Sequence, residues 1–293
     1  MSNKIKLKSH KDIENLRISA KVLASTLDLL VKSTKPGMST DTLDSIAHDF
    51  IISNEGCTPA FLNYQPYGAD YPYPATMCIS VNEVVVHGIP DSYELIVGDI
   101  VSYDGGVVYN GMISDSAVSV IVTEDGCTTI RDILKKVGSE TDIMTIDLSK
   151  LDDKEKLLYH TYKSMHIGIQ AMKIGSHIND ISKAIEKAIP REYGIVKTFS
   201  GHGVGYHVHE EPYVPNYDDG VRGARIQAGM VLAIEPMLTL GTDEVDIMED
   251  SYTAVTSDGS LAAHFEHTVV ATESGPEILT LIPPPPTIIN SQR

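Results

Sequence analysis

Three histidines lie close together in the glycine-rich stretch GHGVGYHVHEEP, residues 201 to 212. They are His202, His207 and His209. An imidazole can serve as a metal ligand, as a general base or as an ordinary polar group on a loop. The stretch alone does not distinguish these roles, because a metal ligand needs partner ligands elsewhere in the chain.

Four acidic residues are the candidate partners. Asp104 follows the apolar run IVSY and Glu235 follows VLAI, while Asp115 precedes SAVSVIV and Glu266 precedes HTVVAT. A carboxylate in a strand that otherwise resembles core is costly to bury unless it is paired or bound to a metal. Four such residues, two in each half of the chain, therefore indicate a functional cluster.

Carboxylates in such a cluster would repel one another. Four carboxylates at close quarters cannot all stay ionised without cations, and two divalent ions would balance their charge. Carboxylate oxygens with one imidazole suit Mn, Fe, Co or Zn. The pattern therefore predicts a two-metal hydrolase, in which the ions bridge a water molecule and lower its pKa.

The elements that must position these residues occur twice. Apolar spacing predicts a helix over 13–33, a stop at Pro36–Gly37 and a second helix over 42–52. Residues 57–125 are predicted to be rich in strands. The helix pair then recurs over 154–189, with a break at Ile174-Gly175-Ser176.

Short motifs repeat in the same order. VHGIP at 86–90 is echoed by VHEEP at 208–212, and GDIVSYD at 98–104 by GMVLAIE at 229–235. We therefore predict an α+β fold of two halves related by a pseudo-twofold axis, which would bring the four acids together at the centre.

The predicted organisation is a single catalytic domain over 1–293. Its parts are an N-terminal half (about 8–125), an insertion with a short helix (about 126–151), a C-terminal half (about 152–282) and a Pro-rich tail (283–293). The stretch YGADYPYPA, residues 67–75, is predicted to be a Tyr/Pro loop.

Composition narrows the class of protein. A formal charge of −17 argues against non-specific binding to nucleic acid or to anionic membranes. Cys57, Cys78 and Cys127 form no paired framework and indicate free thiols in a reducing compartment. The N-terminus lacks the apolar segment of a signal peptide, and no apolar run is long enough to cross a membrane. A soluble cytoplasmic protein is expected.

Five motifs carry a resemblance to a known family. They are CISVNEVVVHGIP, GDIVSYDGGVVYNGMISDS, SGHGVGYHVHEEP, AGMVLAIEPM and FEHTVVAT. Over about residues 8–282, apart from the insertion, the chain resembles type I methionine aminopeptidases, which have the pita-bread fold. The resemblance implies a central antiparallel sheet with helices outside. It also implies two divalent ions, and a bridging water that attacks the carbonyl of an N-terminal methionine preceding a small residue.

The resemblance also implies roles for individual residues. Asp104 would bind one metal ion, and His202 and Glu235 the other. Asp115 and Glu266 would bridge both ions.

Catalytic roles follow in the same way. Glu235 would also carry the proton of the bridging water. His209 would contact the substrate and the developing oxyanion, and His87 would lie on the other side of the scissile bond. His207 matches no functional position of the family, so we expect it to be a loop residue.

The resemblance places the methionine pocket at Phe61, Tyr64, Cys78, Val208 and Tyr252. Cys78 and Tyr64 match the family. Phe61 stands where a cysteine is common, Val208 where a phenylalanine is, and Tyr252 where a tryptophan is, so the pocket is expected to differ in shape.

The implied substrates are the N-termini of nascent polypeptides at the ribosome, handled by a monomer that binds neither specific nucleic acid nor membrane. Two alternatives remain. Proline-specific aminopeptidases share the core but carry a large extra N-terminal domain, whereas only about 10 residues precede the first helix here. A non-catalytic binding protein with the same fold would be expected to lose ligands, whereas all five are present.

Overall fold

The computed structural model describes residues 5–66, 68–138, 143 and 146–281. Most of the predicted Tyr/Pro loop and insertion is therefore described, whereas the predicted tail, 283–293, lies outside. The helices are α1 (His10–Ser33), α2 (Thr40–Ser53), α3 (Ile130–Lys136), the short 3₁₀ helix η1 (Leu148–Lys150), α4 (Asp153–Ala171) and α5 (Ile178–Ala188).

A ten-stranded sheet forms the centre of the structure. Its main path runs β1–β4–β5–β15–β10–β8–β9, and β2, β6 and β16 pair with β4, β5 and β15. These strands are β1 (Cys57–Pro59), β2 (Met77–Val81), β4 (Ile100–Tyr109), β5 (Met112–Thr123), β6 (Gly126–Thr128), β8 (Gly201–Gly203), β9 (Glu210–Val214), β10 (Val231–Ile234), β15 (Glu266–Thr272) and β16 (Gly275–Ile278). All of their pairings are antiparallel.

Two small sheets flank the central one. Their orders are β14–β11–β7 and β12–β13–β3. The strands are β3 (Val84–Val86), β7 (Gly194–Ile195), β11 (Met237–Thr239), β12 (Val245–Ile247), β13 (Ala254–Thr256) and β14 (Ala262–His264).

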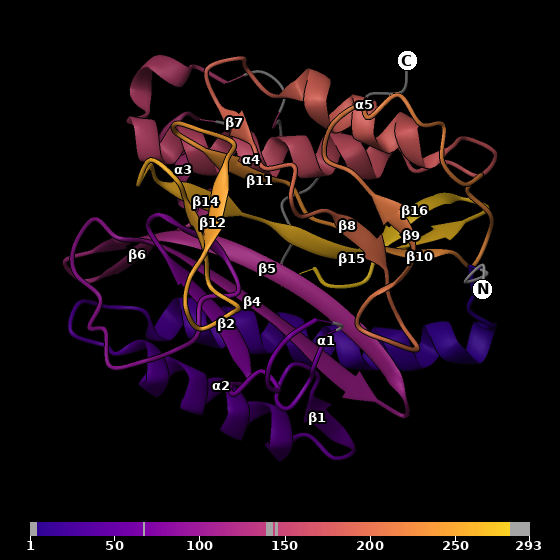
Figure 1. Ribbon diagram of the computed structural model, residues 1–293, viewed down its shortest axis with the longest axis horizontal. Helices are drawn as coiled ribbons and strands as arrows, with labels where there is room; N and C mark the ends of the chain where they lie inside the picture. The colour runs from indigo at the N-terminus through magenta and orange to yellow at the C-terminus, as the bar shows by residue number, and fades with distance from the viewer. Residues whose placement is uncertain (1–4, 67, 139–142, 144–145, 282–293) are drawn as a thin grey trace.

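The helices lie outside the sheet in two pairs. Helix α1 packs along β4 and β5 with α2 beside it, and α4 packs on α5 and on β10, β11 and β14. Figure 1 shows one pair on each side of the central strands. The predicted α+β class, with an antiparallel sheet between helices, is confirmed.

The two halves share a local construction that the sequence echo predicted. The turn after α1 contains Gly37, whose N–H donates to the carbonyl of Leu95 at 2.8 Å. The turn after α4 contains Gly175, whose N–H donates to the carbonyl of Ile226 at 2.9 Å. Both glycines have positive φ, 80° and 92°, a conformation that glycine adopts without steric cost. In each half the helix turn thus docks on the segment that leads into a central strand.

Two apolar stretches within the region predicted to be rich in strands, 75–88 and 94–109, are interrupted in the structure. The stretch 75–88 divides into β2 and β3 at Asn82, which has a φ of 56°. The stretch 94–109 becomes a strand only at Ile100, after a turn through Gly98, whose φ is 94°. Left-handed residues interrupt a strand that hydrophobicity alone would continue. The insertion does contain a short helix, α3.

A large apolar core lies between the helices and the sheet. It includes Leu27 on α1, Tyr103 on β4, Ile181 on α5 and Val269 on β15. Among the described helices, none is both long enough and apolar enough to cross a membrane.

Candidate active site

Five adjacent strands of the central sheet supply the five predicted metal ligands. Asp104 lies on β4, Asp115 on β5 and Glu266 on β15. Glu235 directly follows β10, and His202 lies on β8. Because these strands are neighbours in the order β4–β5–β15–β10–β8, residues up to 162 positions apart in the chain form one row.

The pairing register places the three β4, β5 and β15 acids on one face. Asp104 and Glu266 both lie opposite Ala117, from the two sides of β5. Directly opposed residues share a face of the sheet, and so do residues two apart in a strand. Asp115 is two residues from Ala117, so its side chain projects on the same side as those of Asp104 and Glu266.

The shared face of the sheet continues across β10. Ala233 lies opposite both His202 on β8 and Thr268 on β15. Glu235 is two residues beyond Ala233, and Glu266 is two residues before Thr268, so the face is shared across all five strands. The geometry of the sheet therefore explains why the ligand-type side chains converge.

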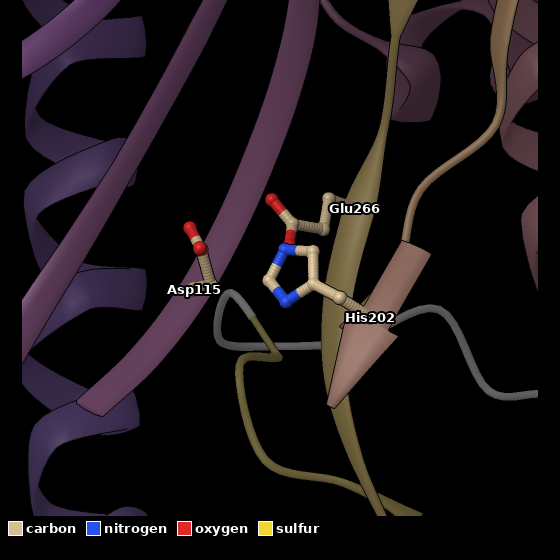
Figure 2. A group of neighbouring side chains, drawn as sticks. All are labelled: Asp115, His202 and Glu266. Atoms are coloured by element: carbon tan, nitrogen blue, oxygen red, sulfur yellow. The ribbon is translucent and has the colours of Figure 1, made fainter. Parts of the chain in front are cut away.

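The convergence is close enough to hold a cation. One ligand atom each from Asp115, His202 and Glu266 lie within 4.8 Å of one another. Figure 2 shows the three side chains projecting from separate strands into the same space. Nε2 of His202 also lies 3.2 Å from Oε1 of Glu235.

Unsatisfied oxygens indicate that the site fits a metal. Oδ1 of Asp104, Oδ1 of Asp115 and Oε1 of Glu266 are buried, and within the described chain they have no hydrogen-bond partner. Buried polar atoms are nearly always paired. Carboxylate and imidazole donors that converge without partners are what a divalent metal ion requires.

Burial and mutual repulsion change the pKa values of the clustered acids. Burial raises the pKa of Asp104, and burial together with neighbouring carboxylates raises the pKa of Asp115 and Glu266. The repulsion expected for clustered acids is therefore present in this fold.

The pKa of Glu235 changes in the opposite direction. Burial would raise its pKa, but contacts with His202 and His264 hold the pKa of Glu235 below its usual range. For His202, burial would lower the pKa, but the carboxylates of Glu235 and Asp115 raise it. Glu235 is therefore the acid of the cluster that most readily stays ionised.

The cluster lies in a cavity of about 350 Å³. Its lining contains the five ligand-type residues, His87, His209 and the five residues predicted for the methionine pocket. These pocket residues are Phe61, Tyr64, Cys78, Val208 and Tyr252. Cys78 lies directly opposite Asp104 in the β2–β4 pairing, so the apolar part of the cavity adjoins the acids. The structure thus brings together every residue singled out from the sequence for this site.

Two histidines face the cavity from opposite halves of the chain. His87 follows β3 with a φ of 60°, and its ring meets Phe199 edge-on at 5.1 Å. Burial lowers the pKa of His87 to about 4. A buried imidazole of this kind stays neutral near pH 7.

His209 lines the same cavity. The residue is exposed, and Tyr64 Oη lies 2.9 Å from its Nδ1. Partial burial and the neighbouring His202, at a ring separation of 4.5 Å, lower the pKa of His209. His209 is therefore also neutral near pH 7 and can donate or accept a hydrogen bond.

His207 has a different environment. Its side chain is exposed, and its N–H donates to Oε1 of Glu210 at 2.9 Å. His207 is not among the described residues that line the cavity. This placement agrees with a loop residue.

His264 is the site residue that the sequence reasoning missed. It is 1 % exposed, and its Nε2 lies 3.6 Å from Oε2 of Glu235. His264 stands two residues before Glu266 in HFEHTVVAT, but the two residues lie on different strands, β14 and β15, so local spacing did not signal the contact with Glu235.

Comparison with known proteins agrees with this geometry. Residues 14–273 match the metallopeptidase family M24. A methionine aminopeptidase from Borreliella burgdorferi is 44% identical over 279 residues, which cover 94% of this chain and 98% of the relative.

Solved structures agree as well. Methionine aminopeptidase from Thermotoga maritima superposes with a TM-score of 0.80 at 34% identity, and the match covers 94% of this chain and 99% of that one. Prolidase from Pyrococcus furiosus gives a TM-score of 0.67 at 18% identity, and the match covers 65% of the prolidase chain. The prolidase likeness shows a shared fold alone. The prediction of a metal-dependent hydrolase is confirmed, and the chain belongs to metallopeptidase family M24, among the methionine aminopeptidases of the pita-bread fold.

Proposed function

We propose that this protein removes the N-terminal methionine of nascent polypeptides and acts on chains with a small second residue. The proposal is supported by the cavity in which five ligand-type side chains lie next to an apolar pocket. The acids can hold metal ions beside a reacting carbonyl, and the pocket can receive the unbranched methionine side chain.

The proposed ligand assignment follows the strand order. Asp104 would hold one divalent ion, His202 and Glu235 would hold the other, and Asp115 and Glu266 would contribute to both. The donor set admits Co, Mn, Fe or Zn. When bound, the two ions would polarise the methionine carbonyl and lower the pKa of the attacking water.

The protein groups around that centre have separate tasks. Glu235 is ionised, and two imidazoles flank its carboxylate, so we assign it the proton that the attacking water releases. Neutral His209 donates a hydrogen bond to the oxygen on which negative charge develops. His87, from the other half of the chain, orients the peptide on the opposite side of the scissile bond.

The apolar part of the cavity fits the methionine side chain. Phe61, Cys78, Val208 and Tyr252 are buried and form one cluster, with Tyr64 packed against it. A thioether is flexible and makes favourable contacts with aromatic rings. We also propose that the protein acts as a monomer in the cytoplasm, on nascent chains at the ribosome.

Selectivity for the second residue provides the test. We expect release of methionine from Met-Ala-Ser, and much slower release from Met-Leu-Ser at equal concentration. The second side chain points at the wall formed by His87 and the loop from His202 to His209, where a bulky group clashes. A clash should discriminate by more than the roughly 10- to 200-fold that one methylene provides.

The digestion is followed by mass spectrometry with added divalent metals. Leu-Ala-Ser and Pro-Ala-Ser serve as controls, because they keep the second and third residues and change the first. Cleavage of Met-Leu-Ser at a rate comparable with Met-Ala-Ser would show that the second-residue rule does not hold. Preferential cleavage of the Pro-initiated peptide would assign another first residue to the pocket.

A further inference from the structure

The loop that carries His209 is fixed by a residue from the other end of the chain. Residues 204–209 connect β8, which holds His202, to β9, which begins at Glu210. Nζ of Lys8 lies 2.7 Å from Oε2 of Glu210. The two side chains are 2 % and 6 % exposed, so this ion pair is almost completely removed from water.

The other oxygen of Glu210 holds the loop backbone. Oε1 accepts hydrogen bonds from the N–H of Tyr206 at 2.5 Å and from the N–H of His207 at 2.9 Å. The carboxylate of Glu210 therefore connects Lys8 to Tyr206 and His207, the two residues that precede Val208 in the chain. Charge-assisted hydrogen bonds of this kind are stronger than neutral ones and fix geometry.

Lys8 is itself held in place at its backbone and along its stem. Its N–H donates to the carbonyl of Gly229 at 2.8 Å, just before β10. Its Cε would lie only 2.4 Å from a Cβ on Gly205. The stem thus packs directly on the loop backbone, where Gly205 leaves the space that a side chain would fill.

Tyr206 adds a second attachment to the same N-terminal segment. Its hydroxyl donates to Oδ2 of Asp12 at 2.7 Å, and Nζ of Lys8 lies 5.3 Å from its ring centroid. Neither Lys8 nor Asp12 lines the cavity among the described residues. Through Glu210 and Tyr206, both side chains nevertheless contact the segment that carries His209.

We propose that Lys8 is a positioning residue of this enzyme, whose buried ion pair with Glu210 sets the place of the His209 ring relative to the scissile carbonyl. The inference rests on the role proposed above for His209. Loss of one partner of a buried ion pair leaves an uncompensated charge. Glu210 must then move toward water, and its hold on the loop is lost.

The test compares Lys8→Met with the wild-type enzyme on Met-Ala-Ser. Methionine keeps the length of the stem and removes the charge. We expect kcat to fall roughly 10- to 100-fold, because a small misplacement of a catalytic group far from the mutation can cost that much. KM should change by less than about threefold, since the metal ligands and most of the pocket lie outside the loop.

Lys6→Met is the matched control. Lys6 is exposed and lies 5.6 Å from the ring centroid of the same Tyr206, so the variant removes the same charge next to the same loop. Its kcat should equal that of the wild type. Equal kcat values for folded Lys8→Met and Lys6→Met would overturn the proposal.

Glu210→Gln in the Lys8→Met background gives a second readout. The amide oxygen of glutamine still accepts from Tyr206 and His207 but carries no charge, so about tenfold of the lost kcat should return. A merely structural role would give additive losses, and additivity would contradict positioning.

Lys8→Arg replaces Lys8→Met if the latter does not fold. It keeps the charge, but its larger head does not fit beside Gly205, so kcat should still fall, and an unchanged kcat would overturn the proposal. If the wild-type enzyme were inactive on Met-Ala-Ser, the proposed function would be contradicted. That outcome differs from the equal kcat values that would overturn the role of Lys8.

Discussion

Glu235→Gln is expected to abolish release of methionine while the fold is preserved. Glutamine has the same shape, and the backbone carbonyl of residue 235 keeps its hydrogen bond from Asn216 at 3.1 Å. The substitution removes the charge of a proposed metal ligand and the group proposed to accept the proton from the attacking water. Loss of general acid–base catalysis costs about 10²- to 10⁴-fold in rate, and the lost ligand adds to this.

The measurement is kcat on Met-Ala-Ser, with circular dichroism to check the fold. Glu211→Gln is the matched control, because Glu211 is an exposed glutamate in the same chain and the change in charge is identical. If Glu235→Gln keeps more than a tenth of the wild-type rate, the assignment of Glu235 is wrong.

His209→Ala is the second large effect, and it is paired with His207→Ala. The two histidines are two residues apart on one loop, yet only His209 lines the cavity. Removal of a group that stabilises developing charge costs about two to three orders of magnitude in rate. His207→Ala should cost little, since its contact with Glu210 is made by the backbone N–H.

Both variants are assayed on Met-Ala-Ser under identical metal loading. Both substitutions lie in the same loop and make the same change of residue type and size, so each variant controls for the other. A larger loss for His207→Ala would reverse the roles proposed for this loop.

The convergence of the candidate ligands was predictable from the sequence for a specific physical reason. Asp104 and Glu235 each end an apolar run that would otherwise continue, and an acid in such a place is too costly to be an accident. The echo of the two halves predicted convergence without any structure. The turns at Gly37 and Gly175, which follow the first helix of each half, dock in the same way in both halves.

The pairing register was not predictable. Asp104 and Glu266 meet because both lie opposite Ala117, and a shift of one residue would move either side chain to the other face. Register depends on long-range pairing, which no local pattern reports. His264 was missed for the same reason, because its contact with Glu235 crosses between β14 and the end of β10.

The contact between Lys8 and Glu210 was also not predictable from the sequence. In the sequence, Lys8 is one of several lysines in a basic opening segment. Only the folded chain shows that its side chain is buried against Glu210, 202 positions away. A partner at that separation leaves no trace in composition or periodicity.

We propose that four carboxylates and one imidazole hold two divalent ions in one cavity. The most direct test is the metal content of the wild-type protein, measured by plasma mass spectrometry after dialysis against saturating Mn²⁺ or Co²⁺ and removal of free metal. We expect close to two ions per chain. A value of one would contradict the dinuclear centre, and a value near zero would contradict the metal site itself.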